Sequence, residues 1–195
     1  MEELAPGLYR WTARHPEWIP DGEPGSPADW PPDVGCVAHA APEALVLVDP
    51  LVADWAALDA LVERHGLPVA VLTTMRFHGR SRAEVAERYG AALVSHREPP
   101  PAGVARIPIE GMDEAMVWLE GPRALVPGDR LIGDGAGGVC PCPASWLRYL
   151  PAKPGADELR AALRALLELP AESVLVSHGE PVRHGGRAAL EAALA

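Results

Sequence analysis

Residues 44–50 read Ala-Leu-Val-Leu-Val-Asp-Pro, a short apolar run that is closed by an aspartate and a proline. A run of this kind, bounded by turn-forming residues, predicts a β-strand. Residues 52–65 follow with apolar side chains at helical spacing and Gly66 just beyond them, which predicts a helix. Residues 69–72 form a second apolar run, typical of a strand buried on both faces. This strand–helix–strand segment predicts a layered α/β protein.

Similar patterns recur on both sides of this segment. Apolar runs predict further strands at residues 8–12, 34–40, 93–94, 104–109, 115–119, 124–126 and 173–177. Helical spacing predicts helices at residues 81–89, 157–169 and 186–194. Ser81 and Glu84 fit a capping box at the start of the first of these helices. We therefore expect an α/β (α+β) fold with mixed sheets, in a single domain that spans residues 1–195.

The composition is typical of a globular protein, since 48% of the 195 residues are hydrophobic and 23% are charged. The formal net charge of −10 argues against a nucleic-acid partner, because phosphate binding requires clustered Lys and Arg. No apolar run approaches the ~20 residues that span a bilayer, and the acidic N-terminus lacks the apolar core of a secretory signal. We expect a cytoplasmic location and no membrane partner.

Residues 14–33 are rich in proline and glycine, which predicts a long irregular loop that carries Trp18 and Trp30. Loops of this length in compact domains tend to be functional. One interpretation is that the two indoles pack onto the protein surface, and another is that they form a docking surface for a protein partner. A homodimer is an alternative assembly.

Four segments, in their order along the chain, resemble the metallo-β-lactamase fold of hydrolases. Residues 4–9 resemble the opening strand, and residues 45–50 resemble the strand that ends in aspartate before the first helix. Residues 127–132 resemble the Gly-Asp turn whose aspartate bridges two metals, and residues 174–179 resemble the strand that delivers the last histidine ligand. The resemblance implies a four-layer αβ/βα sandwich with two mixed β-sheets.

The principal metal-binding motif of that family, Thr-His-x-His-x-Asp-His, is altered in this chain. The corresponding residues 74–80 read Thr-Met-Arg-Phe-His-Gly-Arg. Met75 and Phe77 therefore occupy the positions of the first two histidines, Gly79 that of the aspartate, and Arg80 that of the third histidine.

The family's middle histidine is replaced as well, by Gly-Met-Asp at residues 111–113, so Asp129 and His178 are the remaining family ligands. Catalytic zinc normally has three protein ligands and an open position for water. His78, one residue away from the family's spacing, is the third candidate, with Asp113 or Asp134 as more remote options. We expect no functional metal. The alternative is one zinc, iron or manganese ion on Asp129, His178 and His78.

Arg76 and Arg80 argue against a metal, because a guanidinium stays charged and repels a dication beside it. Without a metal, the carboxylate of Asp129 needs a cation or hydrogen-bond donors. We therefore predict an Arg80–Asp129 ion pair in place of the metal, with a nearby hydrogen bond from His178. We expect Arg76 and Thr74 in the same cleft.

These observations predict a hydrolase homologue with a largely lost metal site, a pseudoenzyme or catalytically reduced enzyme that binds an unidentified small molecule in the ancestral cleft. The alternative is a single-metal hydrolase of an ester, thioester or lactam-like bond that uses Asp129, His178 and His78, in which the metal lowers the pKa of a bound water. A protein-interaction module that uses the loop at residues 14–33 is the second alternative.

Three other patterns have simpler interpretations. A single residue separates Cys140 from Cys142, whereas redox and zinc pairs have two residues between the cysteines, and we interpret the two as incidental thiols. The glycine-rich residues 133–138 lack the ending of a P-loop and predict a flexible loop. Ser177 and His178 are adjacent at the end of a predicted strand, where neighbouring side chains point to opposite faces, which argues against a Ser–His nucleophile.

Overall fold

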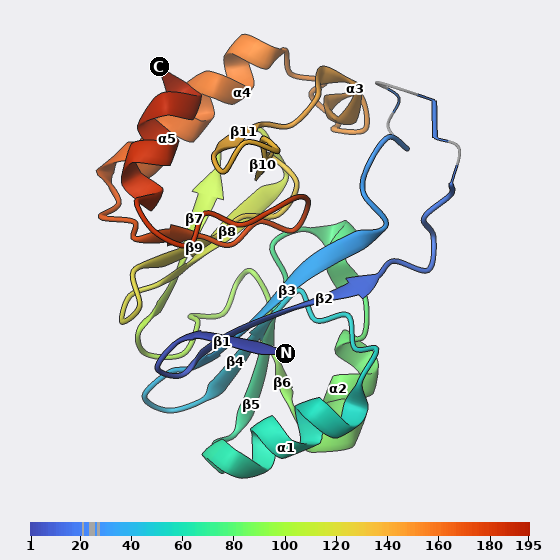
Figure 1. The fold of residues 1–195 in the computed structure, drawn as a ribbon, viewed down its shortest axis with the longest axis vertical. Helices are drawn as coiled ribbons and strands as arrows, with labels where there is room; N and C mark the ends of the chain where they lie inside the picture. The colour runs from blue at the N-terminus through green and yellow to red at the C-terminus, as the bar shows by residue number, and fades with distance from the viewer. Residues whose placement is uncertain (21, 24–25, 27) are drawn as a thin grey trace.

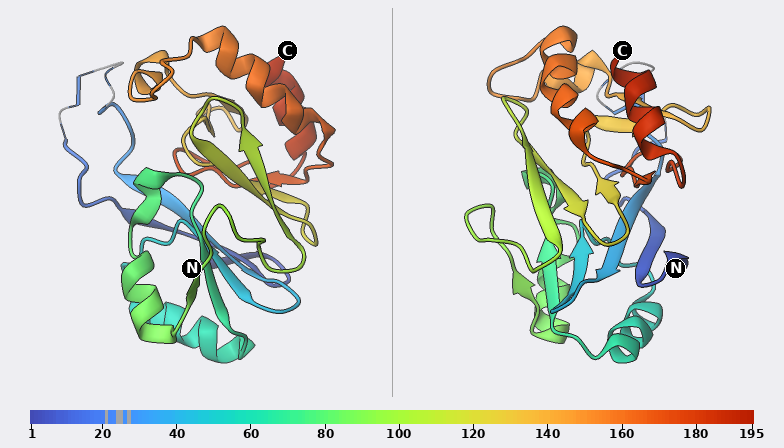
Figure 2. Two further views of the ribbon diagram at one scale, coloured as in Figure 1. Left: turned by 180° about the vertical axis from the view of Figure 1, so that it is seen from behind. Right: turned by 90° about the vertical axis from the view of Figure 1, so that its left-hand side faces the viewer.

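The computed structural model describes residues 1–20, 22–23, 26 and 28–195. Two β-sheets pack against each other, and helices cover the outer face of each sheet (Figures 1 and 2). Helices α1 (Trp55–His65) and α2 (Arg82–Tyr89) cover one side, and helices α4 (Ala156–Leu163) and α5 (Gly186–Leu194) cover the other. These four layers confirm the predicted α/β sandwich.

The first sheet contains six strands in their order along the chain. They are β1 (Glu2–Ala5), β2 (Leu8–Arg14), β3 (Asp33–Ala40), β4 (Leu45–Val48), β5 (Val69–Leu72) and β6 (Ala92–Leu93). Strands β1 to β4 pair antiparallel, whereas β4, β5 and β6 are parallel, so the sheet is mixed. Because Val48 pairs with Leu72, the carboxyl ends of β4 and β5 lie at the same edge and bring Asp49 next to Thr74.

The second sheet contains four strands in the order β12-β9-β8-β7. They are β7 (Val104–Ile109), β8 (Glu114–Leu119), β9 (Ala124–Val126) and β12 (Ser173–Val174). Strands β7, β8 and β9 form an antiparallel meander, and β12 is parallel to β9. A separate hairpin of β10 (Leu131–Gly133) and β11 (Val139–Pro141) follows the turn that contains Asp129.

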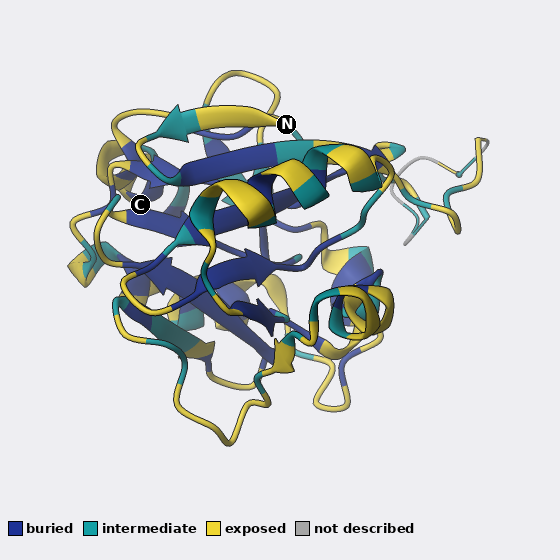
Figure 3. Cartoon of the chain, turned by 90° about the horizontal axis from the view of Figure 1, so that it is seen from below, coloured by how far each residue is buried: buried dark blue, intermediate teal, exposed yellow. Residues whose placement is uncertain are grey.

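Side-chain alternation along β4 shows how the layers are held together. Leu45 and Leu47 belong to the apolar cluster shared with α1 and α2, whereas Val46 and Val48 belong to the cluster between the two sheets. All four side chains are fully buried, and each contributes about 1.5–3 kcal/mol by the usual measure of hydrophobic transfer. The inner strands, such as β3 and β4, are buried, whereas the edge strands β1 and β6 are exposed or half-buried, and helix α1 exposes its outer face (Figure 3).

Several predicted boundaries differ from the observed ones for identifiable reasons. Helix α1 begins at Trp55 instead of residue 52, because the Asp54 carboxylate caps it by accepting from the Ala57 amide at 3.1 Å. The predicted capping box at Ser81 is wrong, since the Ser81 hydroxyl accepts from the Val52 amide and makes no bond to its own helix. The predicted helix at 157–169 begins one residue earlier and ends as a 3-10 helix, η2 (Arg164–Glu168).

Three short strands and one short helix were not predicted. Strand β1 begins with two glutamates, and β10 and β11 end in Gly133 and Pro141, so none of the three is a continuous apolar run. Helix α3 (Ala144–Leu147) has four residues, about one turn, which is too short to show helical spacing. The predicted loop at 14–33 includes residues 21, 24, 25 and 27, which lie outside the described residues. Among the described residues, no helix has both the length and the apolar character needed to cross a membrane.

Candidate metal centre

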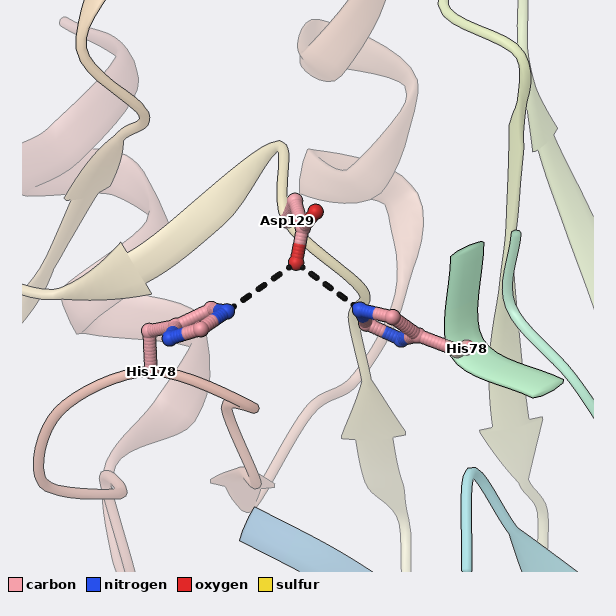
Figure 4. A group of neighbouring side chains, drawn as sticks. All are labelled: His78, Asp129 and His178. Carbon is pink, nitrogen blue, oxygen red and sulfur yellow. Dashed lines mark hydrogen bonds and ion pairs between the residues drawn. The ribbon is translucent and has the colours of Figure 1, made fainter. Parts of the chain in front are cut away.

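His78, Asp129 and His178 converge at one point between the two halves of the sandwich (Figure 4). Asp129 Oδ1 lies 3.0 Å from His78 Nε2 and 3.3 Å from His178 Nε2. One ligand atom from each of the three residues lies within 4.8 Å of the other two. The side chains of His78, Asp129 and His178 are 6%, 19% and 8% exposed. The structure therefore assembles the three residues that the sequence singled out as alternative metal ligands.

His78 is oriented by the carboxyl ends of the two central parallel strands. It lies in a 3-10 helix, η1 (Arg76–Gly79), and its Nδ1 donates to Asp49 Oδ2 at 2.8 Å. The Asp49 carboxylate also accepts from the Thr74 amide at 2.8 Å and from the Thr74 hydroxyl at 2.6 Å. Because a carboxylate only accepts hydrogen bonds, it holds a proton on Nδ1 and directs Nε2 toward Asp129.

Asp129 is held in place through its own backbone. Glu114, the first residue of β8, accepts from three consecutive amides, those of Gly128 at 3.0 Å, Asp129 at 2.9 Å and Arg130 at 3.1 Å. A Cβ on Gly128 would lie 2.9 Å from Glu114 Oε2 and 2.6 Å from Thr74 Oγ1, so only glycine fits between them. Glu114 therefore fixes the turn that presents Asp129.

Glu114 was missed by the sequence analysis, which began this strand at residue 115. Its signal was a charged residue next to a continuous apolar run, since every residue of β8 is buried. A buried carboxylate requires donors or a cation, and the adjacent Gly-Asp turn supplies the donors. Burial raises the pKa of Glu114 to about 7, although the Arg130 charge and the Gly128 amide act in the opposite direction.

His178 is held between two indoles. Its ring makes edge contacts with Trp30, at 5.4 Å between ring centroids, and with Trp146, at 5.2 Å. Its backbone forms an isolated bridge with Val34 of β3, which ties the C-terminal segment to the first sheet. Among the described residues, His178 Nδ1 is buried without a hydrogen-bond partner. Packing and backbone pairing thus hold the Nδ1 side of this imidazole, and Asp129 faces its Nε2 atom.

The electrostatics of the cluster require a positive species between His78 and Asp129. Burial opposes ionisation of Asp129, but the two histidines outweigh it and hold its pKa well below the usual range. Burial also disfavours a protonated His78, but Asp49 and Asp129 outweigh it and raise the pKa of His78 to about 9. With Nδ1 already protonated, a lone pair on Nε2 would face a carboxylate oxygen at 3.0 Å. A second proton or a metal ion removes this repulsion.

The predicted Arg80–Asp129 ion pair is wrong. The Arg80 guanidinium donates to the Asp49 backbone oxygen at 2.9 Å, the Gly35 backbone oxygen at 3.1 Å and the Ser177 hydroxyl at 2.6 Å. These acceptors lie on or next to β3, β4 and the C-terminal segment, so Arg80 links three chain segments. Asp129 pairs with the two histidines instead.

Arg76 is also turned to a different partner. It forms an ion pair with Asp113 at 3.2 Å and lies over the Phe77 ring, with more than half of its side chain exposed. Asp113, a more remote ligand option in the sequence, is therefore engaged outside the cluster. The other option, Asp134, accepts from the Ala136 and Gly138 amides in the β10–β11 hairpin.

The two neighbouring cysteines lie outside the cluster. The Cys142 thiol accepts from Arg130 at 3.8 Å, and burial raises its pKa to about 11. Burial also raises the pKa of Cys140. Both thiols therefore stay protonated near neutral pH, which makes them poor metal ligands.

A cavity of about 320 Å³ opens onto the three candidate ligands. Its walls include Trp30, Phe77, Trp146 and Tyr149. The cavity gives a small molecule access to the exposed side of the cluster, as an open coordination position requires.

A sandwich of two mixed β-sheets covered by helices on both sides is the metallo-β-lactamase fold, and the structural comparisons show that this chain has that fold. It superposes on the metallo-β-lactamase DIM-1 with a TM-score of 0.63 and 12% identity, over 98% of this chain and 96% of that chain. For the metallo-β-lactamase IND-7, the TM-score is 0.60 and the identity 15%, over 100% of this chain and 94% of that chain.

A metallo-β-lactamase family protein from Thermus thermophilus is also similar, with a TM-score of 0.52 and 16% identity, over 97% of this chain and 79% of that chain. No family model matches the sequence, and no curated protein matches it. The similarity to these structures therefore establishes the fold and leaves the activity to be argued from the site.

Proposed function

We propose that this protein is a hydrolase that uses one metal ion bound by His78, Asp129 and His178. The observation that supports this proposal most directly is the convergence of three ligand atoms within 4.8 Å of one another. Two imidazoles and one carboxylate form a donor set that suits zinc, iron or manganese. Three protein ligands beside an open cavity match the general design of a catalytic site.

The residues around the ligands fit a metal as well. The Asp49 carboxylate fixes the tautomer of His78, in the manner of the carboxylates that orient metal-ligating histidines. A bound metal would supply a water of lowered pKa and polarise a carbonyl oxygen. Glu114 keeps Asp129 in position, and the indoles of Trp30 and Trp146 exclude water from His178. The substrate class that we propose is an ester, thioester or lactam-like bond.

Metal content tests this proposal. The protein is equilibrated with zinc, dialysed and measured by elemental analysis, and we expect one zinc ion per chain. His78→Ala and His178→Ala should each lose the ion, because two ligands remain. The matched control is His184→Ala, since His184 is exposed and lies outside the cluster. A chain that retains no metal at micromolar zinc, or a His178→Ala variant that binds as well as the wild type, would rule the site out.

A second candidate function has its own structural support. Doubly protonated His78 would bridge Asp49 at 2.8 Å and Asp129 at 3.0 Å, and both contacts would then be favourable without a metal. The protein would then bind a small molecule in the cavity without hydrolysing it, as the sequence analysis expected. The zinc experiment separates the two candidates. Docking through the loop at residues 14–33, a homodimer and a cytoplasmic location stay predictions.

A further inference from the structure

The walls of the cavity beside the candidate metal centre are largely aromatic. Trp30 and Trp146 flank His178, and the ring of His15 contacts the edge of Trp30 at 5.1 Å. Phe77 and Tyr149 also line the cavity and are 55% and 61% exposed, so their rings are open to a ligand. Such exposed rings beside a concave site mark a surface that an apolar ligand covers.

The two arginines in the described lining of the cavity are bonded to the protein. The guanidinium of Arg80 donates to Gly35, Asp49 and Ser177. Arg130 is 2% exposed and donates to the Met112 backbone oxygen and to Cys142. A ligand carboxylate would therefore lose its hydration without gaining a guanidinium that is free to pair with it.

The carboxylates in the described lining of the cavity, those of Glu17 and Asp129, disfavour an anion when no metal ion is bound. The chain as a whole carries a formal net charge of −10, which repels an approaching anion. The charges and the aromatic walls of the cavity thus both favour an uncharged, apolar ligand.

We propose that the cavity binds an uncharged compound that carries one aromatic ring, with the ring against Trp30 and Trp146. An apolar cavity of about 150 Å³ holds benzene, so the 320 Å³ available here accommodates one ring and a short acyl group. The identity of the reacting bond rests on the proposed hydrolase, and the substrate class becomes neutral aromatic esters or thioesters. The preference for an aromatic ring and for an uncharged ligand rests on the cavity alone.

Calorimetric titration of the protein after removal of metal ions, with two amides and one acid, tests this proposal, because phenylacetate cannot then bind through a zinc ion. Phenylacetamide carries both the ring and the neutral group, acetamide lacks the ring, and phenylacetate carries a charge. We expect phenylacetamide to bind at least tenfold more tightly than acetamide and at least tenfold more tightly than phenylacetate. Trp30→Leu should weaken phenylacetamide binding at least fivefold. Trp55→Leu, on the outer helix α1 and outside the cavity, is the control that should not change it.

The outcomes separate this inference from the proposed hydrolase. Failure of phenylacetamide to bind, equal or tighter binding of phenylacetate, or an unchanged affinity in Trp30→Leu would overturn the aromatic preference. Zinc stoichiometry is measured on a second portion of the same preparation after equilibration with zinc. A protein that binds phenylacetamide but no zinc would refute the hydrolase and support the aromatic preference of the cavity. A protein that binds zinc but no phenylacetamide would support the metal site and refute the aromatic preference.

Discussion

Glu114 offers the sharpest test of how the fold holds its site. Its carboxylate accepts three backbone amides, with Oε1 bound to Gly128 and Oε2 bound to both Asp129 and Arg130. Glu114→Ala leaves all three buried donors without an acceptor. Glu114→Gln keeps one carbonyl oxygen, which in the Oε2 position retains two of the three hydrogen bonds.

The expected magnitudes follow from this count. An orphaned buried donor costs about 1 kcal/mol or more, so Glu114→Ala should lower the free energy of unfolding by about 3 kcal/mol and Glu114→Gln by about 1 kcal/mol. For a chain of this length, about 3 kcal/mol corresponds to a decrease in Tm of about 6–12 °C. Because the Ala substitution also frees the turn that carries Asp129, we expect at least a tenfold loss of zinc affinity.

Calorimetric unfolding and zinc titration measure the two effects on the same preparations. Glu120→Ala is the matched control, because Glu120 is an exposed glutamate just beyond the end of the same strand. It should change neither quantity. A Glu114→Ala variant as stable as the Glu120→Ala variant, or equal losses for the Ala and Gln variants, would refute the assignment of three hydrogen bonds to this carboxylate.

Three further predictions concern neighbouring residues. Gly128→Ala places a methyl group 2.6 Å from Thr74 Oγ1, so we expect a loss of about 1–3 kcal/mol in urea unfolding, and an unchanged midpoint would contradict the close approach. Arg80→Ala should cost about 2 kcal/mol in urea unfolding because it orphans the backbone oxygens of Gly35 and Asp49, and an unchanged midpoint would contradict these two hydrogen bonds. In metal-free protein, the pKa of His78 is about 9 in the folded state against an ordinary value of 6.5, so the folded chain binds this proton more tightly. The contribution of this proton to the free energy of unfolding is complete below about pH 6.5 and is lost as the pH rises through about 9. In denaturant unfolding at a series of pH values, we expect the free energy of unfolding to decrease by about 3 kcal/mol over this range, and His78→Gln should abolish the decrease.

Much of the fold was predictable because apolar periodicity records which face of each element is buried. The strand at Val69–Leu72 and the helix at Gly186–Leu194 were predicted at their observed bounds. The hairpin of β10 and β11 was not, since each of its strands has two apolar residues before a glycine or a proline and glycines fill the segment between them. Short elements owe their conformation to tertiary pairing, which a single sequence does not show.

The candidate site was predictable in its ligands but not in its supports. Asp129 and His178 stand at turn and strand ends that the resemblance located, and the structure places His78, the third candidate ligand of the sequence analysis, beside them. The direction of the Arg80 side chain was wrong, because position in a motif does not determine which acceptors a long flexible side chain reaches. Glu114 was missed because a single sequence does not show which backbone amides will donate to a buried carboxylate.

The choice between the two proposed functions depends on what occupies Nε2 of His78. Asp49 fixes a proton on Nδ1, so Nε2 faces Asp129 and needs either a proton or a metal ion. The two compete, because a ligating imidazole must release that proton. Raising the pH therefore weakens the metal-free arrangement and strengthens metal binding at the same atom. The negative charges of Asp49 and Asp129, which raise the pKa of His78, also attract a dication. A proton on His78 needs no second imidazole, whereas a metal ion needs further ligands, and His178 lies beside Asp129 as such a ligand. This additional ligand is the reason to favour the metal.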